Sequence, residues 1–516
     1  MKRIFTVLAA TLLLTAAMAV SASASDYDAV AEDLSAIGVF RGTSDGFELD
    51  RAPTRSEAAI MLVRLYGAED EAKTAYEAGD ITMPFTDVGA TAAPYVAWLH
   101  DQGIVNGTSA TTYGTGACSA QNYVVFLLRA LGYEDGTDFA YADALTFAQE
   151  KGFYDPLMFS GTFLRDDLAA VTYQALGTDL KDGSTYLLKS LIDSGAVDAQ
   201  AAAPMTEKIE AYRALQQASA DMESTAMDVD VTASIDMSVA QDGETVSMPM
   251  SMDGSMQMIL DENDLQMAYD FDIGAMGETM TMREWLKDGW VYVESAVENG
   301  EAVRTKTQVN LEEQLALLEQ VQASASVDVV NVSGLAMVNS ITSKTQGSDT
   351  VYTMGITGSS MNGMMETAFS TLMGGGTFPA EDLQTMMDML SFGDITAVYT
   401  VDRSGDLKSI QMTFSVEMNV PAEEGGTPMA MTADYDMSMT VNATGDSVRI
   451  TFPDFSSFEE VTVPDLDTSE NSRTVYVTQT GKRYHYDSSC NGGTYYESTL
   501  EEALSRGLTP CEKCVL

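Results

Sequence analysis

Positions 54–65 read Thr54-Arg-Ser-Glu-Ala-Ala-Ile-Met-Leu-Val-Arg-Leu65, and this segment sets the organisation of the first part of the chain. Ala58, Met61, Leu62 and Leu65 fall at i, i+3, i+4 and i+7, which is the spacing of one apolar face of a helix. The spacing predicts a helix over residues 56–66, and the apolar face of that helix has to be covered by other elements.

The same pattern recurs twice further along the chain, over residues 121–131 and 165–176. A Gly-containing turn precedes each helical run, in the forms Ile37-Gly-Val-Phe-Arg-Gly42, Gln102-Gly-Ile-Val-Asn-Gly107 and, more faintly, Lys151-Gly-Phe-Tyr154. One unit of helix, turn, loop and helix cannot bury its apolar face, but three units can pack together. We therefore predict an all-α unit of three repeats, at residues 25–80, 81–137 and 138–200.

These residues resemble the S-layer homology (SLH) domains of secreted Gram-positive proteins. Thr54-Arg-Ser-Glu57 is similar to the family's Thr-Arg-Ala-Glu motif. The second and third repeats resemble the family where they open with Phe85-Thr-Asp-Val88 and Phe139-Ala-Tyr-Ala-Asp-Ala144. The resemblance implies a pseudo-threefold helical unit whose grooves bind secondary cell-wall polysaccharide and hold the protein noncovalently at the cell wall.

The resemblance also implies which residues contact the polymer, namely Arg55 and Glu57 in the first repeat and Arg165 and Asp167 in the third. A guanidinium suits an anionic wall polymer because it can bind it bidentately. The second repeat has Ala120 where the others have Arg, so at most two grooves carry a cation. An alternative stays open, in which the two Arg only form salt bridges on their helices.

Residues 1–24 read as a secretory signal peptide. Lys2 and Arg3 precede an apolar run from Ile4 to Val20, and small residues lead to a cleavage site after Ala24. The alternative is a membrane anchor, for which the run is short, and no later stretch is apolar enough to span a membrane. We expect a protein that is secreted to the cell wall or cell surface and has no membrane span after signal removal.

Charge divides the chain into three parts. The chain of 516 residues has 27 Lys plus Arg against 77 Asp plus Glu, and a formal charge of −50, which excludes nucleic-acid binding through a charged surface. Residues 26–200 hold 10 basic and 27 acidic side chains, residues 201–465 hold 10 and 43, and residues 466–516 hold 5 and 7. Of the 33 Met, 28 lie between Met205 and Met439, so composition changes at the same places.

The middle part, residues 205–462, is predicted to be a large antiparallel, curved β-sheet. Apolar and polar residues alternate with a period of two over 229–239, 248–252, 256–260, 267–273, 395–401, 410–420, 431–439 and 448–452. Three helices are expected to cover its apolar face, over 206–222, from Asn310, and after Pro379.

This layout resembles the LolA-like lipoprotein carriers, and the resemblance implies a space between sheet and helices for a lipid or another apolar small molecule. Met suits such a space because its side chain is flexible and polarisable. Two other interpretations stay open: Met is simply this protein's core filler, or Met binds copper, although no His or Cys lies in this part to complete a copper site.

The last part follows a linker at residues 463–473 and covers residues 474–516. His485, Cys490, Cys511 and Cys514 are spaced as H-x4-C and C-x2-C, and a piece this small needs a staple. The four side chains are the ligand set of a structural zinc ion, in a zinc-ribbon-like module that resembles small Cys/His modules of secreted Gram-positive proteins. A disulfide among the three Cys is the alternative.

The sequence predicts no catalytic residues. No His lies within residues 201–465, so a Ser–His or Cys–His arrangement has no base there. We expect a non-enzymatic, wall-anchored binding protein. The alternatives are a carbohydrate-active or other hydrolytic enzyme anchored in the same way, and a structural component of a surface layer.

Overall fold

The computed structural model describes, in the main body of the chain, residues 27–155, 162–220, 226–241, 244–261, 264–298, 300–309, 334–358, 389–420 and 429–461. In the C-terminal part it describes residues 474–478, 481–488, 490, 495–499, 503, 506, 508–511 and 513–514. The predicted signal peptide lies outside these residues, as do the helices predicted from Asn310 and after Pro379.

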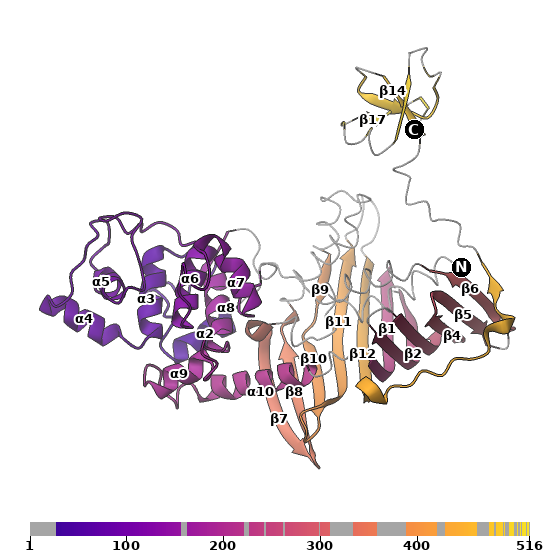
Figure 1. Ribbon diagram of the computed structural model, residues 1–516, viewed down its shortest axis with the longest axis horizontal. Helices are drawn as coiled ribbons and strands as arrows, with labels where there is room; N and C mark the ends of the chain where they lie inside the picture. The colour runs from indigo at the N-terminus through magenta and orange to yellow at the C-terminus, as the bar shows by residue number, and fades with distance from the viewer. Residues whose placement is uncertain are drawn as a thin grey trace.

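The N-terminal part is all-α, as predicted (Figure 1). The three expected helices are α3 (Arg55–Leu65), α6 (Ala120–Ala130) and α8 (Arg165–Leu176). The other elements of this part are α2 (Asp28–Ala36), α4 (Glu69–Ala78), α5 (Ala93–Asp101), η1 (Tyr141–Asp143), α7 (Ala144–Glu150) and α9 (Leu187–Asp193).

The glycines of the repeated turns have a common role. Gly38, Gly103 and Gly152 follow α2, α5 and α7 with φ of 78°, 71° and 77°. This left-handed conformation ends a helix, and Gly adopts it without a steric penalty. Each turn therefore directs the chain from the first helix of its repeat into the loop that leads to the second.

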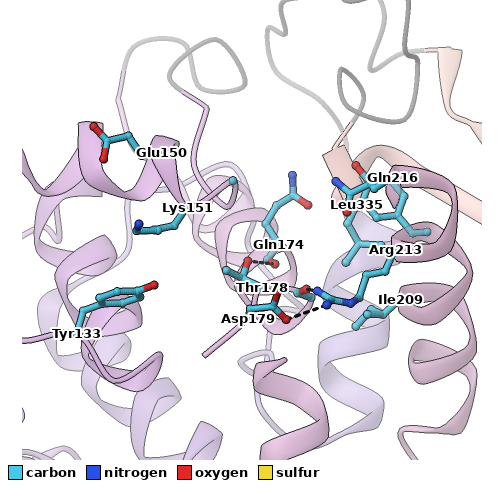
Figure 2. A pocket seen from close by; sticks show the side chains of 13 residues that line it. Tyr133, Glu150, Lys151, Gln174, Thr178, Asp179, Ile209, Arg213, Gln216 and Leu335 are labelled. Atoms are coloured by element: carbon cyan, nitrogen blue, oxygen red, sulfur yellow. Dashed lines mark hydrogen bonds and ion pairs between the residues drawn. The ribbon is translucent and has the colours of Figure 1, made fainter. Parts of the chain in front are cut away.

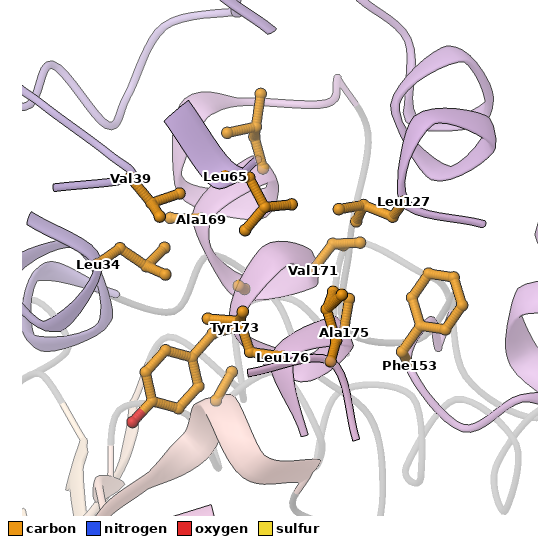
Figure 3. Close-up of a cluster of buried hydrophobic side chains, with 14 of the residues drawn as sticks. Leu34, Val39, Leu65, Leu127, Phe153, Ala169, Val171, Tyr173, Ala175 and Leu176 are labelled. Atoms are coloured by element: carbon orange, nitrogen blue, oxygen red, sulfur yellow. The ribbon is translucent and has the colours of Figure 1, made fainter. Parts of the chain in front are cut away.

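Helix α8 lies at the centre of the helical part. Every residue from Leu168 to Leu176 is buried, and α2, α6 and α9 pack around it (Figure 3). A helix that is buried on all sides belongs to the core. One buried polar pair fixes its orientation, since the hydroxyls of Tyr123 and Thr172 lie 2.7 Å apart.

The predicted antiparallel meander is confirmed as a 13-stranded sheet in the described part of the chain. Its strands are β1 (Ala226–Gln241), β2 (Glu244–Asp261), β3 (Asp264–Ala275), β4 (Glu278–Lys287), β5 (Trp290–Val297), β6 (Val303–Gln308), β7 (Val338–Gln346), β8 (Asp349–Ile356), β9 (Leu390–Phe392), β10 (Ile395–Val401), β11 (Leu407–Val420), β12 (Met429–Thr444) and β13 (Glu459–Glu460). The order β13-β6-β5-β4-β3-β2-β1-β12-β11-β10-β8-β7 joins two meanders through the β1–β12 pair, β9 pairs with β11, and only β13 runs parallel to its neighbour.

Two strand predictions differ from the structure. The segments 248–252 and 256–260 belong to the single strand β2, which runs through Asp253 and Gly254 without a turn. The strand predicted at 448–452 is wrong, because this segment follows the short helix η3 (Gly445–Ser447) as an irregular extended chain. The aromatic rings that follow it hold the chain against the sheet, and Phe455 of η4 (Phe455–Ser457) stacks on Tyr292 at 3.7 Å.

One face of the sheet is apolar, and the other is polar except where Trp285 and Tyr292 pack against Phe455. The register places Met354, Ala397, Met412, Met437, Ala233, Met252 and Ile273 in one row across seven strands. The predicted helix at 206–222 is confirmed as α10 (Ala203–Ala220), which contacts β7 and β10 at one end of this face. One continuous core joins the residues of α8 to Ile209 of α10, Leu335 and Ala397 of β10. The helical part and the sheet therefore pack directly against each other.

The C-terminal part contains a small four-stranded sheet. Its strands are β14 (Thr474–Val477), β15 (Arg483–His485), β16 (Tyr496–Thr499) and β17 (Thr509–Pro510), in the order β16-β14-β15-β17. Its apolar core is small and consists of Val475, Val477, Tyr484, Ala503 and Leu508. Among the described residues, no helix has the length and hydropathy needed to cross a membrane.

Candidate functional site

The loop between α5 and α6 contacts the start of α3, where the backbone N–H of Arg55 donates to the carbonyl of Gly116 at 2.9 Å. Arg55 donates to the carbonyl of Asn106 (2.8 Å) and to that of Tyr113, and its guanidinium carbon lies 4.4 Å from the centre of the Tyr113 ring. The loop is shaped by Asp87, whose carboxylate accepts from the backbone N–H of Tyr113 and of Gly114 at 2.8 Å each. These hydrogen bonds lower the pKa of Asp87. Arg55 is thus held at the junction of the first and second repeats, half-buried.

Glu57 has a structural position in the first turn of α3, next to Arg55. It forms a capping box with Thr54, since its carboxylate accepts from the Thr54 N–H at 2.8 Å while the Thr54 hydroxyl accepts from the Glu57 N–H at 3.2 Å. The carboxylate also accepts from Arg51 at 2.6 Å. Burial by itself would raise the pKa of Glu57, but the hydrogen bonds from Arg51 and Thr54 outweigh it and lower this pKa to about 2.

Arg165 joins the third repeat to the first. Its side chain is only 5% exposed, and it pairs with Glu57 at 3.3 Å. It also donates to the carbonyl of Phe47 at 2.9 Å and lies 4.8 Å from the centre of the Phe40 ring. Two predicted residues that are 108 positions apart are therefore in contact, and the Arg165 guanidinium is enclosed by protein atoms.

Asp167 occupies the third position of α8, as Glu57 does in α3. It accepts from the backbone N–H of Leu164 at 2.6 Å, and burial raises its pKa to about 6. At the start of α6, the position of the two Arg is taken by Ala120, and Asn122 accepts from the hydroxyl of Tyr141 at 3.0 Å. The second helix of each repeat therefore begins against a segment of another repeat. Among these three helices, only α3 has a partly exposed cation at its start.

The C-terminal part brings together the four predicted metal ligands. One ligand atom from each of His485, Cys490, Cys511 and Cys514 lies within 4.8 Å of the others, and three of these residues are buried. The sulfurs of Cys490 and Cys511 are 3.9 Å apart, and that of Cys514 is 3.4 Å from His485 Nδ1. All three cysteines are free, and a disulfide would need a separation of about 2 Å.

The chemistry of this cluster fits a metal ion. Backbone N–H groups of Lys513 and Cys514 point at the Cys511 sulfur and lower its pKa, which favours the thiolate form that binds metal. Burial lowers the pKa of His485, which favours the neutral imidazole. One imidazole and three thiolates fill a tetrahedral site and leave no position open for a substrate.

A pocket of about 350 Å³ lies where α10 meets the helical part (Figure 2). Arg213 crosses its wall and donates to Asp179 and to the carbonyl of Gly177, at 2.8 Å each. A Cβ on Gly177 would lie 2.9 Å from the Leu335 side chain, so a larger residue there would require Leu335 to move. The pocket therefore lies at the junction between the helical part and α10.

Two family models match the chain. A model of a family of unknown function, DUF6612, matches residues 208–466, which is half of the chain. The chain belongs to this family. The S-layer homology domain matches residues 84–117, the segment that contains α5 and the loop holding Arg55. This DUF6612 protein is thus a surface protein with an SLH domain, which supports anchoring at the cell wall.

Solved structures add little to this assignment. A DUF1329 family protein from Desulfovibrio piger has 9% identity and a TM-score of 0.14, and the match covers 46% of this chain and 94% of that one. The outer membrane protein OprG from Pseudomonas aeruginosa has 9% identity and a TM-score of 0.08, with 42% and 95% covered. Neither likeness supports an argument about fold or function. Among curated proteins, none matches the chain.

Proposed function

We propose that this protein is held noncovalently to secondary cell-wall polysaccharide by the three repeats at residues 25–80, 81–137 and 138–200. The observation that carries the proposal is the position of Arg55 at the junction of two repeats. Its guanidinium contacts the loop between α5 and α6, which belongs to the matched SLH segment. Arg55 is half-buried whereas Arg165 is buried, so of the two only Arg55 is offered to an anionic polymer. Arg165 contributes indirectly, because its enclosed guanidinium holds Glu57 and the first repeat in place.

Retention on isolated native cell walls tests this proposal. Arg55→Ala is expected to weaken retention of the whole chain without changing its helical circular dichroism. Arg403→Ala is the matched control, because it removes one positive charge from an exposed turn of the sheet. Equal retention of the two variants would remove Arg55 from the binding groove.

We further propose that residues 205–462 form a non-catalytic domain whose Met-rich face binds an apolar ligand. Support comes from the continuous apolar row across the sheet and from the half-buried state of many of its residues. Uptake of an uncharged fluorescent alkyl probe by the whole chain is the expected result. No uptake, together with turnover of glycoside or ester substrates, would favour an enzyme instead.

The third element of the proposal is a structural zinc ion held by His485, Cys490, Cys511 and Cys514. The free thiols and their spacing support zinc over a disulfide. Elemental analysis should find one zinc per chain and thiol titration should find no disulfide. A chain without zinc that contains a disulfide by mass would reverse this assignment.

A further inference from the structure

The side chain of Glu284 places a carboxyl group on the apolar face of the sheet. The register places it opposite Tyr269 of β3 and Val293 of β5. Its neighbours on the same face of β4 are Met282 and Leu286, and Leu286 is 4% exposed. Burial raises the pKa of Glu284, and that of Tyr269 is raised to about 12, mainly by burial and further by the charge of Glu284. A carboxylate here is partly desolvated, and pairing with a cation would stabilise it.

The chain supplies no such cation among the residues that the structure describes. Arg283, next in sequence, points to the opposite face and pairs with Asp270 (2.9 Å) and Glu294 (3.0 Å). Lys287 lies over the Phe452 ring and Lys306 over the Trp290 ring, on that opposite face as well.

The remaining cations of the sheet region are also placed elsewhere. All ten Lys and Arg of residues 201–465 lie in described segments, and this region has no His. Two belong to α10 and contact the helical part, and three lie on β7, in the β10–β11 turn and at the start of β11. Of the last two, Arg304 pairs with Glu294, and Arg449 donates to the carbonyls of Asp446 and Val448. The segments 310–333 and 359–388, which connect strands, contain no Lys, Arg or His.

We propose that the Met-rich face binds an amphiphile with a single alkyl chain and a protonated amine, whose ammonium group pairs with Glu284. This inference rests on the proposed binding of an apolar ligand and specifies its chemistry by charge complementarity. From Glu284, the alkyl chain would run past Met282 and Phe271 toward Val231 of β1 and Met439 of β12. Four strand spacings of about 4.8 Å separate β4 from β12, which gives about 19 Å of apolar surface for the chain.

The experiment compares three probes of equal chain length, dodecylamine, dodecanol and dodecanoate, at neutral pH and below micelle formation. Each displaces a neutral fluorescent alkyl probe from the whole chain. The amine is expected to bind about tenfold more tightly than the alcohol, as for a hydrogen bond to a charged group, and dodecanoate more weakly than both. Glu284→Gln is expected to remove the preference for the amine and to leave dodecanol binding unchanged.

The matched control is Glu417→Gln. Glu417 is exposed on the polar face of β11, opposite Thr432, so this variant removes the same charge and leaves the apolar face intact. The control should keep the preference for the amine, which separates a specific ion pair from attraction of a cation to a chain of formal charge −50.

The possible failures are distinguishable. Equal binding of amine and alcohol, or an undiminished preference in Glu284→Gln, would overturn the assignment of Glu284 while leaving apolar binding intact. Binding of none of the three probes would overturn the apolar-ligand proposal and this inference together. A dimer in sedimentation that Glu284→Gln dissociates would assign the face to a second copy of the chain, and would also overturn the inference.

Discussion

Replacing Glu57 by Gln is the sharpest test of how the repeats hold together. Gln keeps the shape of the side chain, and it also occurs at this position of capping boxes. The substitution removes the negative charge that faces Arg51 at 2.6 Å and Arg165 at 3.3 Å. Since the Arg165 side chain is 5% exposed, the variant leaves a buried guanidinium without its carboxylate partner.

The magnitude follows from the pKa of Glu57, which is lowered from 4.5 to about 2. A shift of that size corresponds to a contribution of at most about 3.4 kcal/mol to the free energy of unfolding, at 1.36 kcal/mol per pKa unit. The side chain of Glu57 is 28% exposed, so solvent screening reduces this value. Charged hydrogen bonds contribute about 1.5–3 kcal/mol to stability in other proteins. We therefore expect Glu57→Gln to lower the free energy of unfolding by about 2–3 kcal/mol at neutral pH.

The pH dependence has a definite sign. A carboxyl whose pKa is depressed in the folded state stabilises fully above its unfolded pKa, here about 4.5, and loses this effect as the pH falls toward 2. Urea unfolding, followed by helical circular dichroism, should therefore separate wild type from Glu57→Gln at pH 7 and bring them together near pH 2. Glu77→Gln, at an exposed position of α4, is the control and should match wild type. A difference between wild type and Glu57→Gln that is equal at pH 7 and pH 2.5 would refute the electrostatic explanation.

Two further predictions concern other parts of the chain. Removing the proposed zinc ion with a chelator, or replacing Cys511 by Ser, is expected to make the C-terminal part sensitive to protease, because the apolar core of that part is too small to fold alone. The helical signal should stay unchanged. Resistance that persists without metal would contradict this. Ile209→Ala is expected to lower the free energy of unfolding by about 2–5 kcal/mol, because this side chain of α10 is fully buried. A loss no larger than that of Glu207→Ala, at an exposed position of the same helix, would show that α10 does not hold the junction together.

The sequence alone predicts the elements whose apolar residues follow a clear period. Helices α3, α6 and α8 begin within one residue of their predicted starts, because each carries an apolar face and a capping residue or its equivalent. Helix α4 was not predicted, since its segment Glu-Asp-Glu-Ala-Lys-Thr-Ala-Tyr-Glu-Ala has a single buried residue, Ala72. Periodicity identifies a helix only where one of its faces is buried.

The contacts between distant segments could not be predicted. The ion pair between Glu57 and Arg165 forms only when the third repeat packs back against the first. The pairing of β1 with β12 depends on which edge strands of the two meanders lie side by side. Alternation at 448–452 predicted a strand, but the same alternation occurs in any extended segment with one side against apolar groups. By contrast, the clustering of the four candidate metal ligands could be predicted, because metal chemistry limits both residue types and spacing.

The acidity of the middle part gains a structural explanation from the strand register. Asp236 lies directly opposite Asp434, and Asp253 opposite Asp272, all on the polar face. Such like-charge pairs cost stability. A slip of one residue would cost much more, because it would move these carboxylates onto the Met-rich face and the methionines into water. The charges therefore select one register, and they also make this face repel an anionic wall polymer. On the proposed attachment, contact with the wall is left to the few placed cations of the helical part, with Arg55 the most accessible of the predicted ones.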